Sequence, residues 1–350
     1  MIEAHESKKY LEIVRDLRKS NTLFDMHVHP HEVIFRQCNY SPNTSYDGLY
    51  STNSSDFLSP YVTDITLSRP EEGRKAFDLF LRPEFLKKKV CRLYTHTGPR
   101  AFIEQMELSG VDKVLLLPVA PPNGTVDSQM SAMKTMFGGN ERFYFAWSPP
   151  NTVAKDNILT FAKRAISLFS IRAVKVHPNV TEIDLTSSIA RQRLETIVEI
   201  CGTLQLPLIV HGGRSPLLPN QKASSWASLR NLKHINWGLS SAPVVIAHAG
   251  SYGYNLQEIK DETLPTLEKL LSTYDNLMVD LSGLHIEALI LCLQKIDTNR
   301  ILFGSDALYE PQWASIVKLL IAIKTTTRRF EHVFVQIVSA NPLKTIFIES

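Results

Sequence analysis

Short β-rich segments alternate with helical patterns along most of the chain, and this alternation constrains the fold more than any other feature. The first segment begins at Leu23, and seven others follow at 111–117, 142–147, 171–177, 206–211, 244–248, 276–281 and 301–306. Helical patterns such as 189–204 and 264–271 lie between them. Strand alternating with helix implies parallel pairing through right-handed crossovers, so eight such units predict an α/β fold closed into a (β/α)8 TIM barrel.

An open, doubly wound sheet is the alternative arrangement of the same elements. Such a sheet binds its ligand at one switch point, commonly beside a Gly-rich phosphate loop after the first strand. No Gly-rich loop follows the strand that begins at Leu23, and polar residues gather at several strand ends. The barrel is therefore the favoured prediction.

Two segments depart from the regular alternation. Apolar residues at helical spacing predict an amphipathic N-terminal helix over about 5–19. The connection after the first strand, residues 30–97, is much longer than the others and emerges at the catalytic face of a barrel, which predicts a lid or pocket wall. A solvated excursion without a role is the alternative. With 350 residues and 44% hydrophobic content, we expect a single domain over 1–350.

The composition narrows the classes of partner. Basic and acidic residues nearly balance, 38 against 35, and no long basic stripe is present, so nucleic acid is not an expected partner. The four cysteines lie far apart, which is typical of free thiols in a reducing compartment. The N-terminus is charged, and no apolar run approaches the ~18 residues needed to cross a bilayer. We expect a soluble, cytoplasmic protein with no membrane partner.

The predicted strands end in histidines and an aspartate. His27 and His29 alternate along the first strand and should share one face, with Asp25 deeper on that face. Two imidazoles on one face predict a metal site, whereas a lone strand-end histidine is also explained by a structural hydrogen bond. The other residues at such ends are His177, His211, His248 and Asp306.

The residues around these ends support a site at the C-terminal face, where barrel active sites form. Glycine follows closely after His211 and His248, which allows the backbone to approach an ion or substrate, although a tight βα turn has the same need. Asp306 ends an apolar strand, and a buried carboxylate is costly unless it is paired or bound to metal.

Five motifs in a fixed order carry a family resemblance. They are Asp25-x-His27-x-His29, Val210-His211-Gly212-Gly213, Ala247-His248-Ala249-Gly250, Phe303-Gly304-Ser305-Asp306 and the closing run 339–347. Together they resemble the amidohydrolase superfamily, and most closely its branch with enzymes of the aminocarboxymuconate-semialdehyde decarboxylase type. The resemblance covers most of the chain, with 30–97 as the main unmatched part.

The resemblance implies a metal centre and roles for its residues. His27, His29, His211 and Asp306 would hold one divalent ion, with a water completing its shell, and His248 would be a catalytic residue beside that water. Asp306 could also take the proton of the water. Nitrogen and oxygen ligands favour zinc and also allow manganese, iron or cobalt.

Two features depart from this pattern. Lys175 precedes His177 with the same side-chain direction, and binuclear relatives use a carboxylated lysine on that strand to bridge two ions. A second metal at Lys175, His211 and His248 is therefore an alternative, as are an ion pair deep in the barrel and a contact with substrate charge; His177 is a candidate for the same second-metal or substrate roles. His31 adds a third imidazole near the first strand, and it is read as a lid or substrate contact or as a residue without a role.

The resulting functional hypothesis is a metal-dependent hydrolase of the amidohydrolase type that cleaves a C–O or C–N bond in a small, carboxylated metabolite. A non-oxidative decarboxylase on the same scaffold is the first alternative, and a binding protein without turnover is the second. Candidates for gripping the carboxylate are Arg69, Arg74 and Arg100. The resemblance also implies that the chain could form a homodimer.

Overall fold

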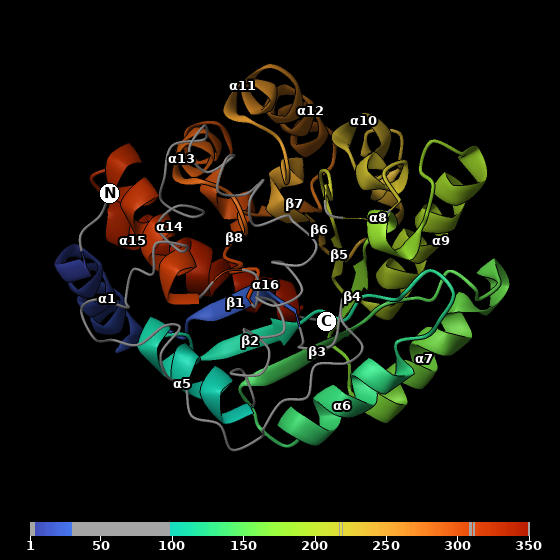
Figure 1. Ribbon diagram of the computed structural model, residues 1–350, viewed down its shortest axis with the longest axis horizontal. Helices are drawn as coiled ribbons and strands as arrows, with labels where there is room; N and C mark the ends of the chain where they lie inside the picture. Colours follow the sequence, from blue (N-terminus) through green and yellow to red (C-terminus); the bar gives the residue numbers. More distant parts are fainter. Residues whose placement is uncertain are drawn as a thin grey trace.

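The computed structural model describes residues 4–29, 99–216, 218, 220–307, 310 and 312–348. Its eight parallel strands form one sheet in sequence order, and helices surround them (Figure 1). This arrangement confirms the predicted (β/α)8 barrel. The strands are β1 (Phe24–Val28), β2 (Lys113–Leu116), β3 (Phe143–Trp147), β4 (Ala173–Val176), β5 (Leu208–Val210), β6 (Val244–Ile246), β7 (Leu277–Asp280) and β8 (Ile301–Leu302).

The strands are rich in Val, Ile and Leu because helices cover their outer face and the barrel interior covers the other. All eight predicted strands are present, and several are shorter than predicted. β5 stops at Val210 and β8 at Leu302, so His211 and Asp306 lie in the connections just beyond the paired strands. Side chains there can turn toward the barrel axis without following the strict alternation of a strand.

The helices agree with the predicted patterns where the chain is described. The predicted N-terminal helix is α1 (Ala4–Arg18), and the patterns at 189–204 and 264–271 fall in α9 (Ser188–Leu204) and α12 (Leu264–Thr273). The others are α5 (Pro99–Ser109), α6 (Asp127–Phe137), α7 (Ile158–Phe169), α8 (Pro178–Thr181), α10 (Leu229–Leu232), α11 (Leu256–Glu258), α13 (Ile286–Lys295), α14 (Gln312–Thr326), α15 (Phe330–Val335) and α16 (Asn341–Ile346).

Main-chain hydrogen bonds close the barrel between β1 and the segment that follows β8. Met26 N donates to Phe303 O at 2.9 Å, and Asp306 N donates to His27 O at 2.9 Å. Val28 and Ala307 form a parallel bridge in the same seam. The seam therefore fixes the backbone of His27 beside that of Asp306.

The face of Asp25 differs from the prediction. The register between β1 and β2 shifts by one residue between Asp25 and Val28, as in a β-bulge. Asp25 consequently points away from the histidines and bonds Gln312 of α14, with Nε2 to Oδ2 at 2.8 Å. The prediction that Asp25 shares the face of His27 was wrong, because an irregular pair breaks the two-residue alternation.

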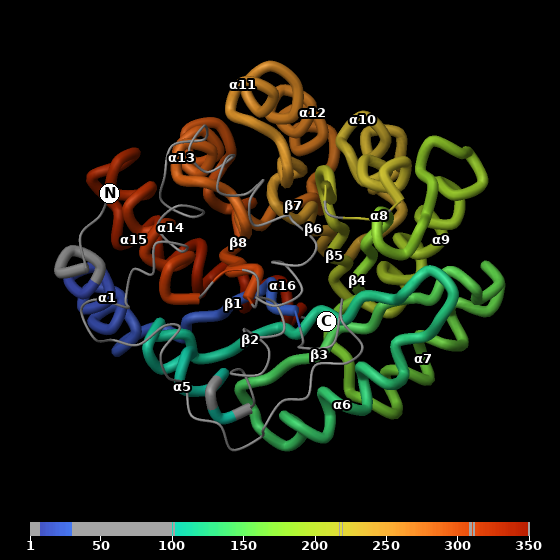
Figure 2. Tube along the Cα trace, in the orientation of Figure 1, coloured from blue at the N-terminus to red at the C-terminus, as the bar shows by residue number. Residues whose placement is uncertain are grey.

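The interior below the strand ends is apolar and is covered at one end by the last helix. Phe24, Met26, Leu115 and Leu302 belong to one buried cluster, and Ile346 of α16 packs into it. Figure 2 shows α16 beside β1 in the middle of the fold. Polar side chains inside the barrel are thereby confined to the opposite end, where the strands end.

Several predictions concern other parts of the chain. The predicted lid, 30–97, lies outside the described residues, together with His31, Arg69 and Arg74. Arg100 is described; it is exposed on α5 and pairs with Glu104 at 2.9 Å. In the described part of the chain, no helix has both the length and the apolar character that a membrane crossing requires.

Candidate metal centre

Three buried ligand atoms converge at the seam between β1 and β8. His27 Nε2 lies 3.1 Å from His29 Nε2, and Asp306 Oδ1 lies 3.7 Å and 3.4 Å from these two nitrogens. All three residues are buried. Two imidazoles and one carboxylate are a donor set that suits a divalent transition metal.

The hydrogen bonds of the two imidazoles show why a cation fits among these atoms. His29 Nδ1 lies 2.9 Å from Leu117 O, and because a carbonyl only accepts, His29 must donate from Nδ1. His27 Nδ1 lies 2.9 Å from Asp280 Oδ2, which makes it the donor to a carboxylate. In the neutral rings both Nε2 atoms then carry lone pairs, and they face each other and Asp306 Oδ1. Three acceptors this close repel one another unless a cation or a proton lies among them, and Lys175 Nζ, 3.4 Å from His27 Nε2, supplies part of that positive charge.

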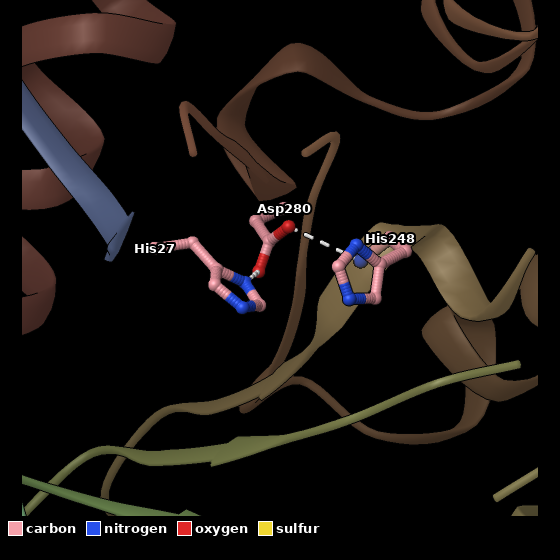
Figure 3. A group of neighbouring side chains, drawn as sticks. All are labelled: His27, His248 and Asp280. Atoms are coloured by element: carbon pink, nitrogen blue, oxygen red, sulfur yellow. Dashed lines mark hydrogen bonds and ion pairs between the residues drawn. The ribbon is translucent and has the colours of Figure 1, made fainter. Parts of the chain in front are cut away.

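Asp280, at the end of β7, orients two histidines at once (Figure 3). Its Oδ2 accepts from His27 Nδ1, and its Oδ1 accepts from the backbone N of His248 at 3.1 Å. Burial opposes its charge, but the contact with His27 holds the pKa of the Asp280 carboxyl well below its usual range. Asp280 also forms a group of possible ligand atoms with His27 and His248. Since both of its oxygens already accept hydrogen bonds, we interpret it as a partner that orients the imidazole of His27 rather than as a ligand.

Sequence reasoning missed Asp280 and its neighbour Ser282. The signal was present, because Asp280 ends an apolar strand just as Asp306 does. Ser282 gives no such signal, since a serine in a connection is common. Its Oγ donates to Asp280 Oδ1 at 2.5 Å and lies 2.9 Å from His248 Nδ1.

His248 presents one ring nitrogen to the site. Its Nδ1 lies 2.9 Å from Ser282 O, so Nδ1 carries the proton and Nε2 is left with a lone pair. The backbone of His248 is left-handed, with φ of 56°, in the turn after β6. Burial lowers the pKa of the imidazole, which makes the ring a neutral acceptor near neutral pH. Such strained backbone at a non-glycine residue is common in functional sites.

Asp306 also has a left-handed backbone, with φ of 61°, in the turn after β8. Its Oδ1 points to His27 and His29, while its Oδ2 accepts no hydrogen bond from the described residues. Burial favours the neutral acid, yet contacts with His29 and the neighbouring imidazoles place the pKa of Asp306 below its ordinary value. The Asp306 carboxyl is therefore ionised at neutral pH, and Oδ2 is the oxygen that can take a proton.

Lys175 lies beneath the imidazoles inside the barrel, as its predicted direction requires. Its Nζ is 3.4 Å from His27 Nε2, and the side chain is fully buried. Burial lowers the pKa of the amine to about 8. Within the described part of the chain Lys175 forms no ion pair, so the reading as an ion-pair partner finds no support there.

The rings of His211 and His177 continue the group of imidazoles beyond His248. These two rings stack with centroids 3.8 Å apart, and the centroid of the His211 ring also lies 4.9 Å from that of His248. His211 Nε2 lies 3.3 Å from Ser215 Oγ. His211 does not belong to the converged group of His27, His29 and Asp306, so its role as a fourth ligand stays a prediction.

The glycines after His211 serve the packing of neighbouring connections. A Cβ on Gly212 would lie 2.7 Å from Ala247 O, and one on Gly213 would lie 2.5 Å from Tyr252 N. Gly213 and Tyr252 form a parallel bridge. The close approach expected at these glycines is therefore between the connections after β5 and β6, which sets the positions of His211 and His248 relative to each other.

Comparisons with known proteins agree with this architecture. Residues 127–329, more than half of the chain, match the sequence profile of the amidohydrolase family. No curated protein matches the chain.

Solved structures share the fold at low identity. A probable 2-pyrone-4,6-dicarboxylic acid hydrolase from Acinetobacter baumannii with citric acid bound is 14% identical (TM-score 0.52, 93% of this chain and 100% of that one). A 5-carboxyvanillate decarboxylase from Novosphingobium aromaticivorans, complexed with manganese and 4-hydroxy-3-methoxy-5-nitrobenzoic acid, is also 14% identical (0.55, 94% and 97%). An amidohydrolase from Burkholderia multivorans with bound zinc is 12% identical (0.54, 94% and 100%).

Proposed function

Because the chain belongs to the amidohydrolase family of enzymes, we propose that it is a metal-dependent hydrolase that cleaves a C–O or C–N bond of a small, carboxylated molecule. One observation carries this proposal. Two imidazole nitrogens and one carboxylate oxygen converge at the barrel mouth, and the second oxygen of the same carboxylate accepts no hydrogen bond from the described residues. That combination provides a place for an ion and a base beside it.

His27, His29 and Asp306 would hold the ion, with His211 as the proposed fourth ligand. Zinc is our first choice for this donor set and manganese the second, because solved structures with this fold contain each of them. A bound divalent ion would polarise the substrate carbonyl and lower the pKa of water toward neutrality.

The residues of the chain supply the proton transfers. Asp306 Oδ2 takes a proton from the attacking water as the water oxygen bonds to the carbonyl carbon. His248 keeps its proton on Nδ1, so its Nε2 can orient the water as an acceptor. When the C–O or C–N bond breaks, the proton on Asp306 passes to the leaving group. Asp280 and Ser282 keep the two histidines in the tautomers that these roles need.

Non-oxidative decarboxylation is the second candidate. The same fold occurs in a 5-carboxyvanillate decarboxylase that was solved with manganese and a nitrobenzoic acid. In that reaction the substrate loses carbon dioxide and its carbon gains a proton, so a residue must be protonated at the start. His248 Nε2 and Asp306 Oδ2 are both acceptors in this structure, which favours the activation of water over the delivery of a proton to carbon.

The fate of oxygen and carbon separates the two reactions. Metal-loaded protein is screened with lactones, amides and unsaturated carboxylic acids, and the compound that turns over is then incubated in oxygen-18 water. We expect one solvent oxygen in the product and no carbon dioxide. Stoichiometric carbon dioxide with an unlabelled product would overturn the hydrolase proposal and support the decarboxylase. The Asp306→Asn variant serves as the control for uncatalysed exchange.

The same preparation tests the number of ions. We propose one ion per chain, to be measured by elemental analysis of protein purified without chelator. Two tightly bound ions, together with the added mass of a carboxylate on Lys175, would support the bridged site instead.

A further inference from the structure

Tyr252 borders the candidate metal centre, although sequence reasoning gave it no role. It follows the turn of His248 in the connection after β6. Its ring centroid lies 4.7 Å from that of His248 and 5.8 Å from that of His211. The side chain is partly exposed, unlike the imidazoles that it touches. Tyr252 therefore lies at the edge of the buried group of imidazoles.

The backbone, and not the hydroxyl, holds Tyr252 in place. Arg214 N donates to Tyr252 O at 2.7 Å, and Tyr252 N donates to Gly212 O at 3.4 Å. The bridge between Gly213 and Tyr252 has no room for a Cβ on the glycine. Removal of the phenol oxygen should therefore leave this connection unchanged.

A glycine in the connection after β7 makes room for the ring beside Asp306. Gly283 has φ of 63°, and a Cβ on it would lie 3.0 Å from Tyr252 Cε2 and 3.4 Å from Asp306 Oδ2. The edge of the Tyr252 ring and Asp306 Oδ2 thus border the same small space. A substrate atom attacked beside Asp306 would lie within reach of the ring edge.

The hydroxyl of Tyr252 has no hydrogen-bond partner among the residues that the structure describes. Tyr144 provides the contrast, because its hydroxyl accepts from Lys113 Nζ at 3.0 Å. Tyrosine has an ordinary pKa of about 10, so this phenol is a hydrogen-bond donor at neutral pH. The Tyr252 hydroxyl can therefore donate a hydrogen bond to an acceptor atom of a substrate that binds at this site.

We propose that Tyr252 is a substrate-binding residue whose hydroxyl donates a hydrogen bond to the carboxylate of the substrate beside His248 and Asp306. The inference rests on the proposed function, since it needs a small carboxylated substrate at this site. It identifies the anchor for the substrate carboxylate, a role that was expected of an arginine.

The test compares two tyrosines that each lose only a hydroxyl. Tyr252→Phe and the control Tyr144→Phe are loaded with zinc, and the dissociation constant for 4-hydroxy-3-methoxy-5-nitrobenzoic acid is measured by titration. A hydrogen bond to a charged acceptor is worth about tenfold or more in affinity, so Tyr252→Phe should bind the probe at least about tenfold more weakly than wild type. Tyr144→Phe should bind it as wild type does, and the zinc content should be equal in all three proteins.

The methyl ester of the probe shows whether the carboxylate is the acceptor. Tyr252→Phe should lose clearly less affinity for the ester than for the acid, since the ester carbonyl is an uncharged and weaker acceptor. An equal loss for acid and ester, or wild-type affinity for the acid in Tyr252→Phe, would overturn the role of Tyr252 and leave the proposed function standing. If wild-type protein binds no carboxylate probe, the proposed substrate class fails and this inference fails with it.

Discussion

The two faces of strand β1 carry buried polar groups that differ in their partners. On the inner face, His27 and His29 meet the charged carboxylates of Asp280 and Asp306. On the outer face, Asp25 accepts hydrogen bonds from neutral donors, namely Ser305 N at 3.0 Å, Ser305 Oγ at 2.5 Å and Gln312 Nε2 at 2.8 Å. The inner face of β1 therefore carries hydrogen-bond acceptors that favour a cation. The outer face carries one carboxylate, Asp25, whose hydrogen bonds come from neutral donors.

The pKa values of two carboxyls reflect this difference. Asp280 and Asp25 are equally buried, and burial alone raises the pKa of both. The imidazole of His27 holds the pKa of Asp280 well below its usual range, whereas the neutral donors around Asp25 leave its pKa raised to about 6. We infer that the inner face is organised for ion chemistry and that the outer face ties β1 to β8 and α14. Changes on the two faces should therefore have separable effects.

The largest effect should follow from removing both imidazoles of the inner face. We expect the variant with His27→Ala and His29→Ala to lose its metal entirely, since two of the proposed ligands are gone. Elemental analysis of protein purified without chelator measures this loss. Exposed His234→Ala should keep the wild-type content. A double variant that retains a full ion would show that the cation site lies elsewhere, with His211 and Lys175 as the residues to test next.

A large loss of turnover with a retained fold should follow from Asp306→Asn. The amide cannot take a proton from water, so we expect turnover to fall by about a hundredfold or more. Circular dichroism checks that the barrel is intact. His248→Asn should also lower turnover, with the metal content near normal. Loss of the metal in the His248 variant would contradict its assignment as a residue beside the ion and make it a ligand.

An intermediate effect should follow from Asp280→Asn, which changes a partner of the imidazoles and no proposed ligand. The variant keeps a similar shape but weakens the hydrogen bond that fixes the tautomer of His27. Changes in such partners commonly reduce metal affinity or activity by about 10- to 100-fold. Competition with a chelator measures the affinity, and Ser282→Ala provides a milder change at the same place. Unchanged affinity in Asp280→Asn would mean that packing alone orients His27.

The fold was largely predictable because its signals are local. Each strand shows as a short apolar run, and each of His27, His211, His248 and Asp306 stands at or just beyond the end of such a run. The seam between β1 and β8, which brings His27 beside Asp306, is a consequence of closing the barrel.

The features that the sequence did not predict depend on contacts between segments that are distant in the chain. The face of Asp25 was predicted wrongly because a register shift depends on the neighbouring strand. The stacking of His177 on His211 depends on where two connections turn. Tyr252 was missed because nothing in the sequence shows that Gly283 leaves space for its ring.

The smallest effect on the metal centre should come from the outer face, through Asp25→Asn. The pKa of Asp25 is raised from 3.8 to about 6 in the folded protein, so its contribution to stability is fully present below about pH 4 and is lost as the pH rises through 6. At about 1.4 kcal/mol per pKa unit, the loss is up to about 3 kcal/mol.

The amide introduced by the Asp25→Asn substitution does not ionise, so the free energy of unfolding of the variant should lack this decline. Urea unfolding of metal-free wild type and variant at pH 4, 6 and 8 measures the difference, which should shift in favour of the variant as the pH rises. A difference that is constant with pH would show that the neutral donors already accommodate the charge of Asp25, and the contrast between the two faces of β1 would then lie in their geometry alone.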